Sequence, residues 1–236
     1  MNTRHDCKGE HVVWFVLVPG ACHGGWWFGP LVDRLRDAGH AATALTLAGL
    51  DPDDPPAPDA NLDTHVAQVV TALEGGDEPA VLVGHSYAGS VITGAADHRP
   101  DLVAALVYLD AFVPEDGDSC WSMTNDWQRE WYIDSVGDTG LGVAPLPFFD
   151  PRCRPHPIGT LLQRCRLTGA HRRVARRHYV LAAEQAWLAR SPFAATAARL
   201  RQDPTWTLRE LDATHNLLAT GPELLTEVLI DLAAAG

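Results

Sequence analysis

The chain has 236 residues, of which 46% are hydrophobic and 20% are charged, so it can bury a core and wholesale disorder is excluded. Its 18 basic and 30 acidic side chains give a net charge of -12, and such a surface repels nucleic acid and anionic membranes. The apolar run Val12–Val18 is too short to span a bilayer, and the first eleven residues are too polar for a signal peptide. The five cysteines lack a CxxC motif, which favours reduced thiols. We expect a soluble cytoplasmic protein without nucleic-acid or membrane partners.

Strand and helix patterns alternate along most of the chain. Residues 1–10 are predicted to form a flexible tail. In this tail and directly after it, His5, Cys7 and His11 are too irregularly spaced to indicate a metal site. Strands are predicted at 12–18, 41–48, 80–83, 103–109, 178–183 and 206–211. Helices are predicted from Pro30 to Gly39, after Asn61, over 87–98 and after Pro222. This order predicts the α/β class, as one domain over 11–236 with a mostly parallel sheet flanked by helices.

Residues 111–175 interrupt the alternation and are too long for a simple loop, so they predict an inserted cap. Its tryptophans (Trp121, Trp127 and Trp131) either line an apolar substrate site or form the core of the cap itself. A basic cluster follows the cap, made of Arg172, Arg173, Arg176 and Arg177. In a strongly acidic chain, this cluster fits a solvated cap edge better than an anion-binding role.

The strongest local signal is the segment Val81–Gly89, in which a buried strand runs into a tight turn and a helix begins at once. It matches the nucleophile-elbow pattern G-x-S-x-G, except that Ala88 takes the last position and Gly89 follows. The turn would lift the Ser86 hydroxyl above the carboxyl ends of the parallel strands, where active sites lie. Ser86 is therefore the predicted nucleophile.

A serine nucleophile needs a base and donors for the oxyanion. The glycine-rich loop after the first strand predicts an oxyanion hole made by the backbone amides of Ala21 and Tyr87. In the same loop, His23 fits a backbone-shaping or core role, and Cys22 a small buried hydrophobe. The predicted base is His215, because it follows the last strand and precedes the last helix.

Four segments together resemble one family: GACHGGWW, GHSYAG, Tyr108–Pro114 and ELDATH. They are similar to the α/β-hydrolase branch that contains plant methyl-salicylate and methyl-jasmonate esterases, hydroxynitrile lyases and small bacterial esterase-like proteins. The resemblance runs from about Val12 to Leu232 and implies the hydrolase fold, serine–histidine catalysis and a helical cap over an apolar pocket.

The chain departs from that family at several positions. Pro19-Gly20 replaces the usual His-Gly, and the lyases have a threonine in place of Gly20 and a lysine in place of Asn216, which favours a hydrolase. The resemblance places the acid of the triad at Gln185, a neutral amide that cannot stabilise an imidazolium. The acid is then Asp110, its alternative Glu184, or neither of them.

These features predict a serine hydrolase that cleaves a small ester, lactone or thioester through an acyl-enzyme, without metal or organic cofactor. The substrate is expected to be apolar or aromatic, and a homodimer is left open. Two alternatives are non-hydrolytic chemistry on a natural-product intermediate (cyclisation, dehydration or C–C cleavage) and a non-catalytic small-molecule binder.

Overall fold

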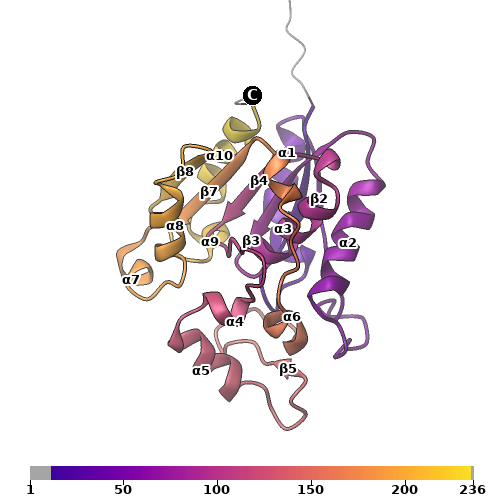
Figure 1. Cartoon of the computed structure of the whole chain (residues 1–236), viewed down its shortest axis with the longest axis vertical. Coiled ribbons are helices and arrows are strands. Elements are labelled where there is room, and N and C mark those ends of the chain that lie inside the picture. The colour runs from indigo at the N-terminus through magenta and orange to yellow at the C-terminus, as the bar shows by residue number, and fades with distance from the viewer. Residues whose placement is uncertain (1–11, 235–236) are drawn as a thin grey trace, which may run out of the picture.

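The computed structural model describes residues 12–234, and the predicted tail and the His5, Cys7 and His11 group lie outside the described residues. Six strands form one sheet in the order β2-β1-β3-β4-β7-β8, and every pair is parallel (Figure 1). The strands are β1 (Trp14–Val18), β2 (Ala41–Ala44), β3 (Ala80–His85), β4 (Val103–Leu109), β7 (Arg177–Ala182) and β8 (Trp206–Leu211). The predicted α/β class is confirmed.

Helices flank the sheet on both faces. The longer ones are α1 (Gly29–Asp37), α2 (Leu62–Glu74), α3 (Ala88–His98), α8 (Ala194–Leu200) and α10 (Pro222–Ala234). Helix α2 packs on α3 and α1 packs on α10. The chain passes from β1 to β2 in one direction and then back to β3, so right-handed crossovers place α1 and α2 on opposite faces.

Local sequence signals explain where these elements begin and end. Strand β3 is buried at every position, as its unbroken apolar run predicts. The Asn61 side chain caps α2 in a capping box with Thr64, and Pro30 lies in the first turn of α1. Strand β2 ends at Ala44 instead of the predicted residue 48. Its partner β1 ends at Val18, so the later residues have no strand to pair with.

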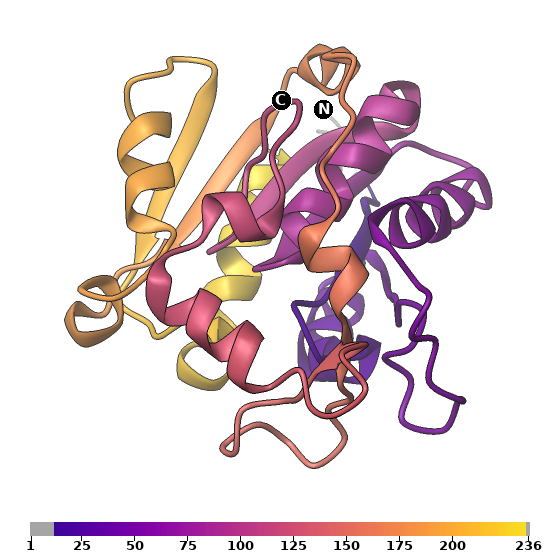
Figure 2. The same cartoon turned by 60° about the horizontal axis from the view of Figure 1, so that its bottom comes forward.

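The segment 111–175 lies between β4 and β7, and most of its short elements form a separate group beyond the carboxyl ends of the strands, whereas its last part returns along α3 (Figures 1 and 2). These are α4 (Cys120–Met123), α5 (Asp126–Asp134), β5 (Gly142–Val143), β6 (His156–Pro157), α6 (Ile158–Leu162) and the 3-10 helix η3 (Ala170–Arg173). The Trp131 ring packs on Tyr132, and its Nε1–H donates to the Ala144 carbonyl. Trp131 therefore belongs to the core of this segment, whereas Trp127 is 40% exposed.

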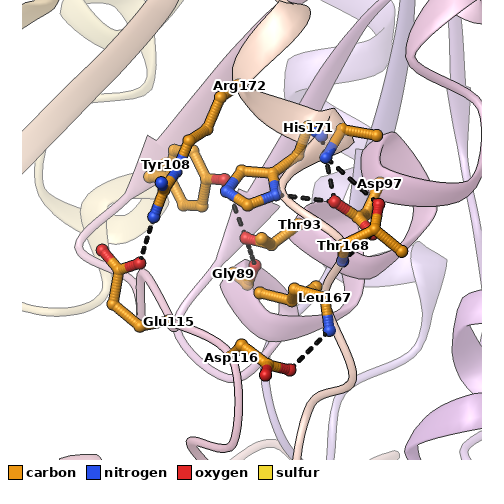
Figure 3. A network of polar contacts seen from close by, with 11 residues as sticks. Gly89, Thr93, Asp97, Tyr108, Glu115, Asp116, Leu167, Thr168, His171 and Arg172 are labelled. Atoms are coloured by element: carbon orange, nitrogen blue, oxygen red, sulfur yellow. Dashed lines mark hydrogen bonds and ion pairs between the residues drawn. The ribbon is translucent and has the colours of Figure 1, made fainter.

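A buried carboxylate ties η3 to the back of α3 (Figure 3). Asp97 is 8% exposed and accepts hydrogen bonds from the backbone and hydroxyl of Thr168 and from the backbone and Nδ1 of His171, at 2.6–3.1 Å. Burial raises the pKa of Asp97, but these hydrogen bonds outweigh burial and hold the pKa well below its usual range. The carboxylate is therefore a stabilising link between the end of the cap and the central domain.

We expect Asp97→Asn to lower the free energy of unfolding by about 2–3 kcal/mol at neutral pH, because an amide cannot accept all four bonds. Since the folded pKa is depressed, the carboxylate stabilises the fold fully above its unfolded pKa of about 4 and loses this effect as the pH falls below that value. Urea unfolding at neutral pH and at about pH 3 measures both effects. An equal difference between variant and wild type at the two pH values would contradict a role for the ionised group.

Candidate active site

Ser86 lies at the turn between β3 and α3, in the left-handed region at φ 55°, and its side chain is almost buried. A non-glycine residue in that region is strained, as expected of a nucleophile elbow. Close packing explains why a small residue is needed near Ser86. A Cβ on Gly89 would lie 1.9 Å from the carbonyl oxygen of Phe112. Position 88, by contrast, holds a fully buried alanine. The departure from G-x-S-x-G is accommodated, because the closest approach to the neighbouring backbone occurs at Gly89.

The structure brings Ser86, His215 and Asp110 into one hydrogen-bonded chain. The Ser86 hydroxyl lies 3.1 Å from Nε2 of His215, in the segment between β8 and the short helix α9 (Leu217–Thr220). Nδ1 of His215 lies 2.7 Å from Oδ2 of Asp110, which directly follows β4 and is fully buried. Strand order β3-β4-β7-β8 brings these three strand ends to the same edge of the sheet.

The hydrogen-bond partners of Asp110 are all N–H groups. This determines the ionisation state of the carboxylate and the tautomer of His215. Besides His215, it accepts from the indole Nε1–H of Trp187 at 2.8 Å and from the Ala182 amide at 3.3 Å. A carboxylate with three N–H donors is ionised, so Nδ1 of His215 carries the proton and Nε2 presents a lone pair to Ser86. This arrangement suits general-base catalysis by His215.

The alternative acid, Glu184, is not placed at His215. Its carboxylate accepts from the backbone amides of Ala186 and Trp187 and caps the short helix α7 (Gln185–Leu188). Gln185 is the exposed first residue of that helix. Glu184 therefore has the role of a helix cap, and the neutral residue at position 185 is no gap in the hydrogen-bonded chain, because Asp110 reaches the ring from the neighbouring strand.

The glycine-rich loop after β1 lies against Ser86, the predicted nucleophile. A Cβ on Gly20 would come within 3.0 Å of the Ser86 Cβ and 2.8 Å of Nδ1 of His85, so the loop approaches Ser86 only because residue 20 is a glycine. Within residues 12–234, the amides of Ala21 and Tyr87 donate no hydrogen bond and remain available to an oxyanion. Nδ1 of His23 donates to the Ala21 carbonyl at 2.7 Å, which fits the predicted backbone-shaping role.

Comparison with known sequences agrees with this geometry, since a model of the alpha/beta hydrolase family matches residues 15–235. The chain belongs to the alpha/beta hydrolase family. Its predicted resemblance to the esterase branch is also confirmed. The hydrolase is a carboxylic ester hydrolase-like enzyme.

Two known proteins are similar to this hydrolase in sequence, and one solved structure is similar to it in fold. A carbendazim-hydrolysing esterase from Nocardioides sp. (strain SG-4G) is 32% identical over 92% of this chain and 98% of that protein. Salicylic acid-binding protein 2 from Nicotiana tabacum is 38% identical, over 64% of this chain and 61% of that protein. An extracellular alpha/beta-hydrolase from a Paenibacillus species has the same fold, with a TM-score of 0.79 at 20% identity over 93% of this chain and 98% of that chain.

His85 is a neighbour of the site that sequence reasoning missed. Its ring packs between those of Trp27 and His215, at 4.6 and 4.5 Å between centroids, and its Nε2–H donates to the His215 carbonyl. Complete burial, with the nearby His215, holds the pKa of His85 well below its usual value, so this ring is neutral. It therefore adds no positive charge beside His215, the predicted base. Only its position next to Ser86 could have indicated this role.

Two more buried histidines form hydrogen bonds with residues near Ser86. One contacts the glycine-rich loop after β1, and the other contacts the residue that follows Ser86. Nδ1 of His156, in β6 of the cap, accepts from the Cys22 amide at 3.2 Å, and its Nε2 lies 2.8 Å from the Thr160 hydroxyl. Nδ1 of His65, in α2, lies 2.8 Å from the Tyr87 hydroxyl. Burial lowers the pKa of both histidines, so both are neutral. Cys22 directly follows the predicted oxyanion donor Ala21, and Tyr87 is itself a predicted donor. Each of the two is thus held by an uncharged histidine ring that no sequence motif indicated.

The remaining chemical predictions concern cysteines and membranes. Cys22 is fully buried, and burial raises the pKa of its thiol, which fits its predicted role as a small hydrophobe. Within the described part of the chain, four cysteines are present as free thiols: Cys22, Cys120, Cys153 and Cys165. Among the helices over residues 12–234, none has the length and apolar character that a transmembrane span requires.

Proposed function

We propose that this hydrolase cleaves a small-molecule carboxylic ester, lactone or thioester through a covalent acyl-enzyme on Ser86. One observation carries the proposal: hydrogen bonds connect the Ser86 hydroxyl to His215 and His215 to a fully buried Asp110. The first joins the Ser86 hydroxyl and Nε2 at 3.1 Å, and the second joins Nδ1 and Oδ2 of Asp110 at 2.7 Å. Both distances are within the range that general-base activation of a serine requires.

The proposed reaction has two halves. Ser86 attacks the carbonyl carbon while Nε2 of His215 takes its proton, and the Ala21 and Tyr87 amides donate to the oxyanion. The intermediate collapses, the imidazolium returns the proton to the leaving alcohol or thiol, and the acyl group stays on Ser86. Water, deprotonated by the same nitrogen, then attacks the acyl-enzyme; the bond from the acyl carbon to Ser86 breaks, the imidazolium returns the proton to the Ser86 oxygen, and the acid is released. Asp110 remains ionised throughout and stabilises the imidazolium.

The surroundings support an apolar or aromatic substrate. The half-buried cap residue Phe149 packs against the ring of His23 in the glycine-rich loop after β1, with 5.0 Å between the ring centroids, whereas the rings that stack on His215, those of Trp187 and Phe193, are buried behind it. Such rings favour apolar or aromatic groups close to the reacting carbonyl. The free thiols support a cytoplasmic location, and a homodimer stays a prediction that gel filtration at several concentrations tests.

The acyl-enzyme is tested with p-nitrophenyl acetate in a stopped-flow instrument. We expect a burst of p-nitrophenol equal to the enzyme concentration, followed by slower turnover, because the acyl-enzyme forms faster than water releases it. A fluorophosphonate probe should add one mass increment to the folded protein, located on Ser86 by peptide mass spectrometry. Urea-unfolded protein is the control, since an unfolded serine has no base beside it.

The two alternative functions give different results. A non-catalytic binder would form no adduct and show no burst. An enzyme diverted to non-hydrolytic chemistry would form the adduct but release p-nitrophenol no faster than the solution does without enzyme. Either result would overturn the proposed ester hydrolysis.

A further inference from the structure

A cavity of about 550 Å³ lies far from Ser86, where β7 and β8 begin and α10 ends. Its walls include side chains of His178, Arg176, Arg177, Arg209 and Asp231. The active site lies at the carboxyl ends of the strands, whereas this cavity begins at their amino ends. It is therefore separate from the site of ester hydrolysis.

His178 is the buried polar group of this cavity. The residue is 4% exposed, and among the described residues neither Nδ1 nor Nε2 of its ring has a hydrogen-bond partner. Burial, with the nearby charges of Arg176 and Arg209, lowers the pKa of His178 to about 4, so the ring is neutral and carries one N–H. A buried N–H without an acceptor is costly, and an anion in the cavity would supply that acceptor.

Two arginines, Arg176 and Arg209, line the cavity near this ring. Arg176 is held by its Nε and Nη1, which donate to the carbonyls of Ala104 and Ala233, and its Nη2 makes no hydrogen bond to another described residue. Arg209 is on the same face of the sheet as His178, because Thr207, two residues before it, pairs with His178 in the parallel register.

Three other charged residues line the cavity, and its total charge remains positive. Nε of Arg177 is buried and has no acceptor among residues 12–234, although its guanidinium lies 5.3 Å from the centre of the Trp206 ring. Arg172 is already paired with Glu115 (Figure 3). Asp231 also lines the cavity and adds one negative charge to it. In a chain of net charge -12, the cavity is a local concentration of positive charge.

We propose that this cavity binds a phosphate group carried by a small organic molecule. Arginine forks match the oxygens of a phosphate, and the neutral His178 can donate a further hydrogen bond to one of them. A phosphate group alone would fill only part of about 550 Å³, and the volume is in the range of cavities that hold small-molecule ligands. The predicted basic cluster thus contributes Arg176 to the site, whereas the Arg177 guanidinium packs on Trp206 on the other face of the sheet and Arg172 fits the solvated edge that the sequence favoured.

Calorimetric titration of the whole protein with inorganic phosphate and with adenosine monophosphate, at constant ionic strength, tests the site. We expect adenosine monophosphate to bind, and Arg209→Gln to weaken this binding about tenfold or more, since one charge-assisted contact is lost. Arg209 is exposed, so its replacement leaves the core intact. Arg190→Gln is the control, because it removes one exposed arginine that lies outside the cavity and should change affinity less than about twofold.

The probes separate the sources of the phosphate. Binding of adenosine monophosphate more tightly than inorganic phosphate supports a site for an organic phosphate, and the reverse order would overturn that assignment in favour of the free ion. Absence of binding by both probes, or equal weakening by the two substitutions, would overturn the site altogether. In the supported case, the nuclear magnetic resonance titration of the His178 ring should shift to higher pH when the probe is bound, because an anion favours the charged ring.

Discussion

Replacing Asp110 by asparagine is expected to lower kcat for p-nitrophenyl acetate by about four orders of magnitude. Asp110 accepts from Nδ1 of His215, from Trp187 and from Ala182, and all three partners are donors. An amide in its place would turn an N–H toward one of these donors or force His215 into the other tautomer. The proton would then occupy Nε2, where Ser86 needs a lone pair.

Glu184→Gln is the matched control, since it also exchanges one carboxylate for an amide in the segment where the family resemblance places the acid. Its remaining carbonyl oxygen can still cap α7, so we expect kcat to change less than about threefold. Both variants should be compared with wild type by burst kinetics and by urea unfolding, which separates a catalytic loss from a folding loss. A larger loss of kcat in Glu184→Gln than in Asp110→Asn would give the role of the acid to Glu184.

Gly89→Ala is expected to lower the free energy of unfolding by about 3 kcal/mol or more, with a fall in Tm of roughly 6 °C or more. The added Cβ would lie 1.9 Å from the carbonyl oxygen of Phe112 and 2.9 Å from its amide nitrogen. These are backbone atoms beside the elbow, and the Phe112 amide itself donates to the Ser86 carbonyl. Relief of the contact would move the nucleophile, so the burst rate should fall as well.

Gly75→Ala is the control for the extra methyl group. Gly75 is exposed at the end of α2, at φ -81° and ψ -5°, and a Cβ there would lie 3.5 Å from the carbonyl oxygen of Ala72, which is an ordinary van der Waals contact. Alanine reduces the freedom of the unfolded chain, so this variant should be more stable than wild type by about 0.5–1 kcal/mol. Thermal unfolding followed by circular dichroism measures both substitutions. A Gly89→Ala protein with the wild-type Tm would show that the elbow tolerates a side chain at this position.

Local patterns were sufficient for most of the architecture. The buried run before Gly84, the Asn61 cap and the apolar face of α10 each depend on residues close together in sequence, and the structure has a strand or helix at each place. The same holds for the turn at Ser86, because the need for small residues there is a property of one short segment. The short helices α4, α5 and α6 were not predicted individually, since segments this short have little periodicity and depend on tertiary contacts.

The sequence by itself predicted Ser86 as the nucleophile, His215 as the base and the alternation of strands and helices, and it reduced the candidates for the acid to Asp110, Glu184 or neither. Only the tertiary structure decided between Asp110 and Glu184 as the partner of the His215 ring. Asp110 and His215 are 105 positions apart, and their contact depends on the register of β4, β7 and β8 and on the indole of Trp187. Such contacts between distant segments leave no periodic or local signal, because each is set by how the strands align and not by the residues next to it.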